Sequence, residues 1–385
     1  MNRHGRQRVI LAAGGTGGHM FPAQALAREL IGRGVDVALM TDKRGAGFGP
    51  ELPQVATYRI SAGAITGGSL SRKLSGGLSL ALGYLQSQRA LKTLQPDCVV
   101  GFGGYASVPA MLAAARAGVR TILHEQNAVM GRANRLLAKR AQVIATSFEQ
   151  VAAMDPAWPA RIALTGNPVR PAIATLSRHP YPVPAESDRL RVLITGGSQG
   201  ARAFNTIIPD ALCRLPEHMR RRLDVSQQVR GPDTQAIQAQ YQEAGITATL
   251  TGFFEDMPER LAATHLLVCR SGASTVAELT VSGRPAIFIP FPFAADDHQT
   301  ANARAVAEAG GGWVMPQSTL TPEILAERLL SLLANPAALA FAARCTRALA
   351  RDEAAQRLAA LVCDAAGDNG TSGHDDKPER GEEAA

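Results

Sequence analysis

Two glycine-rich turns of the same design are the chemically most suggestive feature of this 385-residue chain. The apolar residues 9–13 lead into Gly-Gly-Thr-Gly-Gly-His at 14–19, and the apolar residues 192–195 lead into Gly-Gly-Ser-Gln-Gly-Ala at 196–201. Glycine permits the backbone of a tight turn, and a helix that begins there presents free N–H groups to an anion. One such turn could be no more than a turn. The matched pair predicts two similar α/β domains around a shared cleft.

His19, at the end of the first turn, is the residue best suited to take up a proton near neutral pH. A single histidine often has a structural role instead, so both interpretations stay open. The turn lacks the Gly-x-Gly-x-x-Gly spacing of dinucleotide-binding proteins, and no Walker lysine follows it. The sequence therefore favours neither a nicotinamide cofactor nor ATP.

Two further polar segments follow apolar runs in the N-terminal half. Residues 101–107 read Gly-Phe-Gly-Gly-Tyr-Ala-Ser and offer more backbone N–H groups, which suits a diphosphate. Residues 124–127 read His-Glu-Gln-Asn, four polar side chains in a row. Burying them in a core without partners would be costly, so we expect them to line the cleft, with an ordinary polar loop as the alternative.

The C-terminal half carries its densest group of polar residues at 267–278. An apolar run leads into a turn of small residues and then a helix whose first turn holds Ser274 and Thr275, an arrangement that suits a diphosphate. Glu278 could accept two hydrogen bonds from a ribose diol, or simply be a solvated helix residue. Further on, Asp296 and Asp297 could bind Mg²⁺ or cap the next helix. We favour the cap, with Gln299 facing a sugar.

Short β-branched runs alternate with Ala/Leu-rich stretches in both halves, which is typical of doubly wound parallel sheets. The expected strands are 8–13, 35–40, 97–101, 119–124 and 142–146, then 190–195, 223–229, 246–250, 265–269 and 285–289. Long helices are expected at 322–333 and 336–364. The chain then divides into an N-terminal domain (1–165), a Pro-rich linker (166–190), a C-terminal domain (191–340), a helix packing back toward the N-terminal domain (341–365) and a disordered tail (366–385).

Charge and composition restrict the partners. The net charge of +7 is uneven, because residues 1–160 hold 18 Lys and Arg against 8 Asp and Glu. A basic half favours an anionic partner, but no nucleic-acid motif is present. Five scattered cysteines show no metal-ligand spacing and indicate reduced thiols in the cytosol. Residues 98–115 carry no charge, yet their glycines and proline argue against a membrane span.

Residues 70–92 have the composition of a surface that lies on a membrane. Apolar and basic side chains occur together at near-helical spacing, namely Leu70, Leu74, Leu78, Leu82, Tyr84 and Leu85 with Arg72, Lys73, Arg89 and Lys92. Such a segment suits an anionic lipid surface. A helix packed on its own sheet is an equally good interpretation.

These motifs together resemble the MurG family, the N-acetylglucosaminyltransferases that act on a lipid-linked muramyl pentapeptide in bacterial peptidoglycan synthesis. The resemblance extends over about 8–350. It is carried by residues 14–19 with Pro22, 103–105, 124–127, 166–170, 196–201, 270–278 and 296–302. It implies a GT-B fold, with two Rossmann-like domains and an interdomain cleft. It also implies inverting transfer of GlcNAc from UDP-GlcNAc to the C4 hydroxyl of MurNAc in lipid I, giving the β-1,4-linked lipid II and UDP, with neither cofactor nor metal.

By position, the resemblance also assigns site residues. The implied donor contacts are Thr16, Gly17, Gly18, Asn127, Arg170, Ser198, Phe254, Ala273, Ser274, Thr275, Val276, Ala277, Glu278 and Gln299. The implied acceptor contacts are Gly103, Gly104, Tyr105, His124 and Asn134. At Phe254 the family usually has an aliphatic residue, so a backbone contact carries over but a side-chain role does not. His19 is our first candidate for the base, and Glu125 is the second.

The resemblance further implies a peripheral enzyme on the cytoplasmic face of the inner membrane. Its partners would be UDP-GlcNAc, undecaprenyl-linked muramyl pentapeptide, an anionic membrane surface and other cell-wall synthesis proteins, and its roles would extend to cell shape and division. Another GT-B UDP-sugar transferase or a UDP-sugar epimerase is the main alternative. A membrane adaptor without activity would leave the polar C-terminal motifs unused, and the missing fingerprint disfavours an NAD-dependent oxidoreductase.

Overall fold

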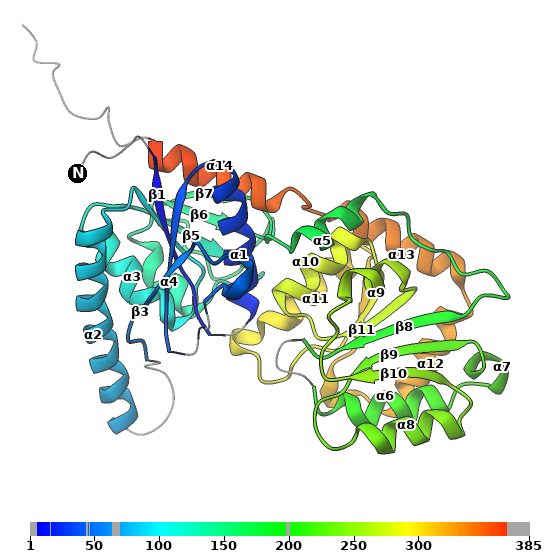
Figure 1. Cartoon of the computed structure of the whole chain (residues 1–385). Coiled ribbons are helices and arrows are strands. Elements are labelled where there is room, and N and C mark those ends of the chain that lie inside the picture. The colour runs from blue at the N-terminus through cyan, green and yellow to red at the C-terminus, as the bar shows by residue number, and fades with distance from the viewer. Residues whose placement is uncertain are drawn as a thin grey trace, which may run out of the picture.

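Two parallel sheets, each covered by helices on both faces, make up the molecule (Figure 1). The structure is a computed structural model that describes residues 6–15, 17–43, 45, 47–63, 70–197 and 201–367, with the backbone alone for residues 70–73. Both sheets have the doubly wound order of a Rossmann-like domain. The expected fold class is therefore confirmed.

The N-terminal sheet has seven strands in the order β3-β2-β1-β4-β5-β6-β7. Their bounds are β1 Arg8–Ala12, β2 Asp36–Thr41, β3 Ala56–Arg59, β4 Cys98–Gly101, β5 Arg120–Glu125, β6 Val143–Thr146 and β7 Arg161–Leu164. The central strand β1 pairs with β2 on one side and β4 on the other, starting at Arg8↔Asp36 and Val9↔Cys98. Beyond Arg8 it is a continuous apolar run, because helices cover both faces of the sheet.

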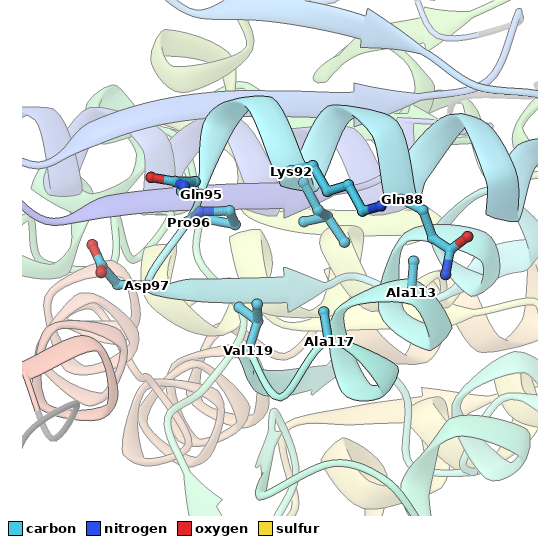
Figure 2. A pocket seen from close by; sticks show the side chains of 9 residues that line it. Gln88, Lys92, Gln95, Pro96, Asp97, Ala113, Ala117 and Val119 are labelled. Carbon is cyan, nitrogen blue, oxygen red and sulfur yellow. The ribbon is translucent and has the colours of Figure 1, made fainter. Parts of the chain in front are cut away.

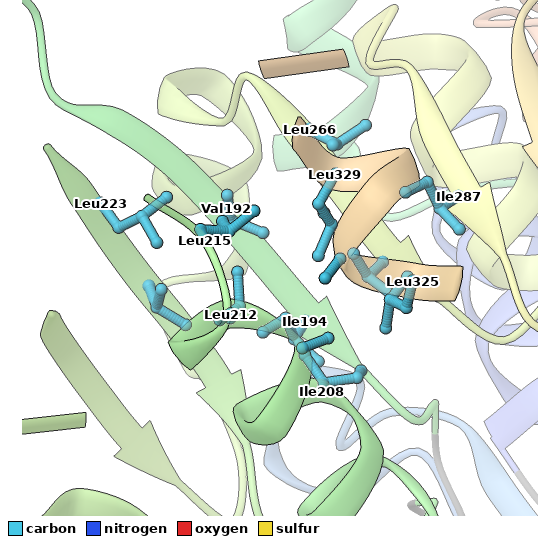
Figure 3. Packing of buried hydrophobic residues seen from close by; sticks show 14 of the residues in the cluster. Val192, Ile194, Ile208, Leu212, Leu215, Leu223, Leu266, Ile287, Leu325 and Leu329 are labelled. Atoms are coloured by element: carbon cyan, nitrogen blue, oxygen red, sulfur yellow. The ribbon is translucent and has the colours of Figure 1, made fainter. Parts of the chain in front are cut away.

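The C-terminal sheet repeats this plan with six strands in the order β10-β9-β8-β11-β12-β13. Their bounds are β8 Leu190–Thr195, β9 Leu223–Gln228, β10 Thr247–Thr251, β11 Leu266–Cys269, β12 Ala286–Phe288 and β13 Gly312–Val314. Figure 3 shows one face of this sheet, where Val192 and Ile194 of β8 meet helix side chains such as Leu212 and Leu329. These side chains are almost completely buried.

The helices lie between the strands and cover the sheets. Those of the N-terminal half are α1 Gly17–Gly32, α2 Leu70–Leu94, α3 Gly104–Arg116 and α4 Arg132–Ala138. Those that follow are α5 Pro171–Ala174, α6 Phe204–Cys213, α7 Glu217–Arg220, α8 Thr234–Glu243, α9 Met257–Ala263, α10 Ala273–Ser282, α11 His298–Glu308, α12 Pro322–Leu333, α13 Pro336–Ala348 and α14 Ala354–Gly367.

Each sheet has one switch point, where the chain has finished the strands on one side of the first strand and continues with those on its other side. The switch points lie between β1 and β4 and between β8 and β11. Loops diverge there and leave a place for a ligand at the carboxyl ends of the strands. The glycine turn after β1, the turn after β4 and the turn after β11 all lie at these points. The fold thus gathers the motifs that the sequence singled out.

Three edge strands were not expected from the sequence. β3, β7 and β13 are each three or four residues long and partly exposed. An edge strand buries only part of its surface, so it lacks the apolar run that reveals an inner strand.

The expected helix at 336–364 is in fact two helices, α13 and α14, with a break at 349–353. α13 packs on α10 and α12, whereas α14 packs on α1 (Figure 1). The segment that returns to the N-terminal domain is therefore α14 alone, not the whole of 341–365. α14 also extends to Gly367, so residues 366 and 367 are helical, and the rest of the expected tail lies outside the described residues.

The Pro-rich linker is not a free connection, because Val169, Ile173 and Leu176 are buried in the C-terminal domain. Where it leaves the N-terminal domain, Gly166 lies against the break before α14. Gly166 has φ +86°, and a Cβ on it would lie 2.5 Å from the Cβ of Arg351. The two segments in which the chain passes from one domain to the other, at Gly166 and at residues 349–353, are thus in direct contact.

Helix α2 at the outer side of the N-terminal domain combines both interpretations of residues 70–92 (Figure 1). It packs against α3, and Tyr84 faces that core rather than the surface, which corrects its expected place in the exposed set. Leu74 and Leu78 are 71% and 75% exposed, and Leu82 and Leu85 continue the same stripe. Within the part of the chain that is described, no single helix is long and apolar enough to cross a membrane. The pair α12 and α13 meets that test only together, with a bend of 92°.

Candidate active site

The two switch points face each other across the junction between the domains. Helices α1 and α10, which begin at them, are in contact. Arg170 joins the two sides, because its guanidinium lies 3.0 Å from a Glu278 carboxylate oxygen on α10 and 5.7 Å from the centre of the Phe21 ring on α1. The helix N-termini at the two switch points, which suit an anion, therefore meet at one place.

A chain of hydrogen bonds leads from the interdomain crossing to His19. His124 Nε2 lies 3.0 Å from the Gly166 carbonyl oxygen, and His124 Nδ1 lies 2.9 Å from Gln126 Nε2. Gln126 Nε2 also donates to the carbonyl oxygen of Phe102 at 3.0 Å. Gln126 Oε1 then lies 3.2 Å from His19 Nδ1.

This chain assigns the proton on each ring by elimination. The Gln126 amide nitrogen donates, so its oxygen must accept, and His19 Nδ1 must carry the hydrogen. Neutral His19 then presents an unprotonated Nε2 next to the Gly103–Gly104 turn, since a Cβ on Gly104 would lie 3.4 Å from that atom. In the same way, His124 Nδ1 accepts from Gln126 Nε2, and His124 Nε2 donates to the Gly166 carbonyl oxygen. His19 Nε2 thus carries no proton in this arrangement, as a base requires, and His124 carries its proton at Nε2.

Burial sets the charge state of both histidines. It lowers the pKa of His19 below its ordinary 6.5, and the nearby Glu125 carboxylate opposes part of this effect. Burial also lowers the pKa of His124, to about 4. The low dielectric of the site penalises the charged imidazolium more than the neutral ring. At neutral pH His19 is therefore free to accept a proton.

Glu125, the second candidate for the base, is occupied by other contacts. Its carboxylate is 1% exposed and accepts from the backbone N–H groups of Asn127 and Gly131, both at 2.9 Å. It also accepts from the side-chain amides of Asn134 at 2.8 Å and Asn127 at 3.3 Å. This geometry holds the 126–134 loop in place and favours His19 as the base. The other amide atom of Asn134, Oδ1, is buried beside Gly103 and has no hydrogen-bond partner among the residues described.

The N-terminus of α10 is open to an anion. Its N-cap residue, Gly272, supplies no side chain, and a Cβ on that residue would meet no atom within 4 Å. Among the described residues, no side chain caps the first-turn N–H groups, and the helix dipole adds positive potential there. The Ser274 hydroxyl is buried and has no hydrogen-bond partner within the part of the chain that the structure describes. A buried unpaired hydroxyl in this position is a further group for a phosphate to satisfy.

Glu278 lies one turn further along α10 and is paired with Arg170. Burial raises the pKa of the Glu278 carboxyl, and Arg170 opposes that rise. The pair keeps a carboxylate acceptor and a guanidinium donor side by side, suited to a diol and a phosphate. Phe254 is 2% exposed and its ring lies 4.3 Å from the Arg260 guanidinium, so its side chain packs in the core of the C-terminal domain.

Arg270 holds the segment after β12 in place. Its guanidinium donates to the carbonyl oxygens of Ile289 and Pro290, both at 2.8 Å, and faces the Phe204 ring at 4.7 Å. Gln299 then accepts the Phe291 N–H at 3.0 Å, which fixes its side chain. Arg270 thus positions the loop whose Phe291 N–H binds the side chain of Gln299 in α11.

The two aspartates in this loop do not cap α11 as expected. Asp297 occupies the N-cap position but makes no side-chain bond to a backbone N–H, and it accepts only from the Thr300 hydroxyl at 2.7 Å. Asp296 instead pairs with Arg132 and Arg135 of α4 in the other domain. The backbone of both aspartates is left-handed, with φ +52° at Asp296 and +51° at Asp297. Over the described residues, no group of three His, Cys, Asp or Glu could bind a metal.

The structure brings most of the expected site residues to the junction. Gly17 and Gly18 begin α1, Gly104 and Tyr105 begin α3 after Gly103, and Ala273, Thr275, Val276 and Ala277 lie in the first turns of α10. Thr16 and Ser198 lie outside the described residues. Sequence reasoning assigned no role to Gln126 or Asn302. Gln126 lay within the polar run at 124–127, and nothing local distinguished Asn302.

Two cavities lie away from His19, and the second is lined in part by the expected donor residues Ala273, Val276 and Ala277. One, of about 420 Å³, lies at the amino ends of β4 and β5 in the N-terminal sheet and is lined by Gln88 and Lys92 of α2 and by Val119 (Figure 2). The other, of about 250 Å³, lies between the domains behind α10 and is lined by Phe148, Val276 and Asn167. Neither contains His19 or the start of α1.

Known proteins share both domains of this chain. Residues 9–146 match the glycosyltransferase family 28 N-terminal domain, and residues 191–358 match its C-terminal domain. A protein of Rhodospirillum centenum is 55% identical over 93% of this chain and 94% of its own length. It is named UDP-N-acetylglucosamine–N-acetylmuramyl-(pentapeptide) pyrophosphoryl-undecaprenol N-acetylglucosamine transferase. A protein of Rhodospirillum rubrum with the same name is 53% identical over 92% of this chain and 91% of its own length.

The chain belongs to the MurG family.

Solved structures agree with this assignment. The crystal structure of Acinetobacter baumannii MurG is similar with a TM-score of 0.74 and 33% identity, covering 93% of this chain and 99% of that one. A UDP-GlcNAc 2-epimerase from Neisseria meningitidis has a TM-score of 0.65 at 13% identity, covering 94% of this chain and 100% of that one. The epimerase shares the fold alone.

Proposed function

We propose that this protein transfers GlcNAc from UDP-GlcNAc to the C4 hydroxyl of MurNAc in undecaprenyl-pyrophosphoryl-MurNAc-pentapeptide, giving lipid II and UDP. The observation that carries the substrates is the 53–55% identity, over more than nine-tenths of the chain, to proteins named for this transfer. The open N-terminus of α10 and the Arg170–Glu278 pair support the binding of a nucleotide diphosphate on the C-terminal domain.

The placement of the charged and polar groups supports the following mechanism. His19 Nε2 takes the proton of the acceptor hydroxyl while the oxygen attacks the anomeric carbon from the face opposite UDP, which inverts that centre and forms the β-1,4 bond. The departing diphosphate gains negative charge at the N-terminus of α10, where free N–H groups and the helix dipole stabilise it. Arg170 adds a fixed positive charge beside it. We therefore expect turnover without a cofactor or a divalent metal.

The acceptor is anchored in a membrane, so the protein must reach one. The exposed stripe Leu74–Leu78–Leu82–Leu85 on α2 lies on the basic N-terminal domain, with Arg89 and Lys92 exposed further along the helix. Apolar insertion with basic side chains beside it suits an anionic lipid surface. We infer peripheral binding at the cytoplasmic face of the inner membrane, where other cell-wall synthesis proteins would be neighbours.

The deciding experiment is transfer of radiolabelled GlcNAc from UDP-GlcNAc to a lipid-linked muramyl-pentapeptide acceptor, with and without EDTA. We expect a labelled disaccharide lipid and the same rate in both arms. Loss of the rate with EDTA would overturn the metal-free mechanism. Release of N-acetylmannosamine or its UDP derivative without any acceptor product would favour the epimerase alternative, whose fold this chain shares.

A further inference from the structure

The segment from Asp296 to Asn302 contacts the N-terminal domain at both of its ends. Asn302 is completely buried, and its Oδ1 accepts the Ala128 N–H at 2.8 Å. Its Nδ2 donates to Asn127 Oδ1 at 3.1 Å and to the Ser271 carbonyl oxygen at 3.0 Å. One side chain thus joins the turn before α10 to the 126–134 loop of the other domain.

The other end of the segment carries an ion pair. The Asp296 carboxylate lies 2.7 Å from the Arg132 guanidinium and is also paired with Arg135. Asp296 has φ +52° and Asp297 has φ +51°, a conformation that residues other than glycine rarely adopt. Such a backbone needs support from its surroundings, and the two arginines hold the side chain of Asp296, while the Thr300 hydroxyl binds that of Asp297.

Gln299, an expected contact of the sugar-nucleotide donor, lies between Asp296 and Asn302 in the chain. Its carbonyl oxygen accepts the Ser271 hydroxyl at 2.7 Å, and its side chain is fixed by Phe291. Asn127, the donor residue supplied by the N-terminal domain, receives its hydrogen bond from Asn302. Contacts to one sugar nucleotide from both domains therefore pass through a single segment of seven residues.

We propose that residues 296–302 form an interdomain latch, in which Asn302 positions Asn127 for the donor and the Asp296–Arg132–Arg135 ion pair holds the domains closed. Asn302 is a positioning residue, because it acts through Asn127. The inference rests on the proposed function for the identity of the donor. It assigns a role to residues that the transfer mechanism does not itself use.

Steady-state kinetics on the full-length enzyme at saturating acceptor test Asn302. We expect Asn302→Ala to raise the KM for UDP-GlcNAc about tenfold or more, because a buried hydrogen-bonded amide is lost. The double variant with Asn127→Ala should lose no more kcat/KM than the worse single variant, since both remove one interaction. Losses that multiply, or an unchanged KM with only a lower melting temperature, would overturn the positioning role.

Salt dependence tests the ion pair. Its side chains are partly exposed, so raising the salt from 50 mM to 500 mM should increase the wild-type KM for UDP-GlcNAc by about two- to fivefold. The KM of Asp296→Asn for UDP-GlcNAc should already be raised at 50 mM salt and should change little up to 500 mM. Asp297→Asn is the matched control, because it removes the same charge one residue away without touching α4. Equal effects of the two variants would refute the latch.

Two further measurements separate the latch from the proposed function. UDP-GlcNAc binding by calorimetry and the radius of gyration by solution X-ray scattering need no acceptor and no turnover. We expect the donor to compact the wild type more than Asp296→Asn. If transfer fails while these differences remain, the proposed function falls and the latch stands. If donor binding and compaction are the same in both proteins, the latch falls.

Discussion

At the scale of single residues, the site depends on how an amide fixes a histidine. The amide nitrogen of Gln126 donates to the Phe102 carbonyl oxygen, so its amide oxygen faces His19 Nδ1. This orientation decides that Nδ1 of His19 carries the proton. Second contacts of this kind commonly select the tautomer of a catalytic histidine. The sequence placed His19 after a glycine turn and Gln126 in a polar run. It could not join them, because 107 residues separate the two.

Replacing His19 tests the base directly. We expect His19→Ala to lower kcat by about 10²- to 10⁴-fold, the usual contribution of a positioned general base. The dissociation constant of UDP-GlcNAc, measured by calorimetry, should stay unchanged. His218→Ala, an exposed histidine on α7, is the control and should keep full activity. A His19 variant with nearly full turnover would transfer the role elsewhere, with Glu125 next to be tested.

Replacing Gln126 should change the pH profile in a defined direction. The hydrogen bond from His19 to Gln126 raises the pKa of His19, in opposition to burial. Because the base must be neutral, kcat/KM should rise with pH through a pKa below 6.5. Gln126→Leu removes the bond, so this acid limb should move to still lower pH while kcat falls about tenfold. A pH–rate profile of both proteins measures this, and a limb that stays in place or moves upward would contradict the assigned hydrogen bond.

At the scale of elements, burial decides what the sequence reveals. The inner strands β1, β4, β8 and β11 were expected to within one residue at each end, because a strand covered on both faces must be an apolar run. The edge strands β3, β7 and β13 gave no such run. The break between α13 and α14 was missed for a related reason. Ala/Leu-rich sequence continues on both sides of residues 349–353, and only the crossing between domains requires the chain to turn there.

Helix α2 gives a prediction for membrane binding. The double variant Leu74→Asp and Leu78→Asp should bind anionic vesicles at least tenfold more weakly, since burying each leucine contributes about 1.5–3 kcal/mol. Both side chains are exposed, so the melting temperature should stay the same. Leu330→Asp on α12 is the matched control. Co-sedimentation with vesicles of varied anionic content measures the effect, and equal binding of all three proteins would reject α2 as the membrane surface.

At the scale of the whole molecule, α14 makes the two domains interdependent. Leu358 and Val362 of this C-terminal helix are fully buried in the core of the N-terminal domain, with α1 and β4 as neighbours. The last described helix of the chain thus completes the first domain. The sequence analysis expected a helix at 341–365 to pack back toward the N-terminal domain, but an amphipathic pattern does not show that α1 is the helix it packs on.

Removing part of this contact should destabilise the N-terminal domain. We expect Leu358→Ala to reduce the free energy of unfolding by about 2–5 kcal/mol, because a fully buried side chain leaves a cavity. Gln356→Ala, on the exposed face of the same helix, should change it by about 0.5 kcal/mol or less. Thermal and urea unfolding of both variants provide the measurement. A Leu358 variant as stable as the wild type would mean that α14 contributes little to the N-terminal core.

The sequence by itself determined the two sheets, their inner strands and the segments at each switch point, because strand burial and glycine turns leave local patterns. It also placed His19, residues 124–127 and the start of α10 among the functional groups. Only the tertiary structure decided that Gln126 orients His19, that Glu125 anchors a loop, and that Asn302 and Asp296 join the two domains. These roles arise from contacts between residues far apart in the chain, and hydrogen bonds of that kind leave no periodic trace in a sequence.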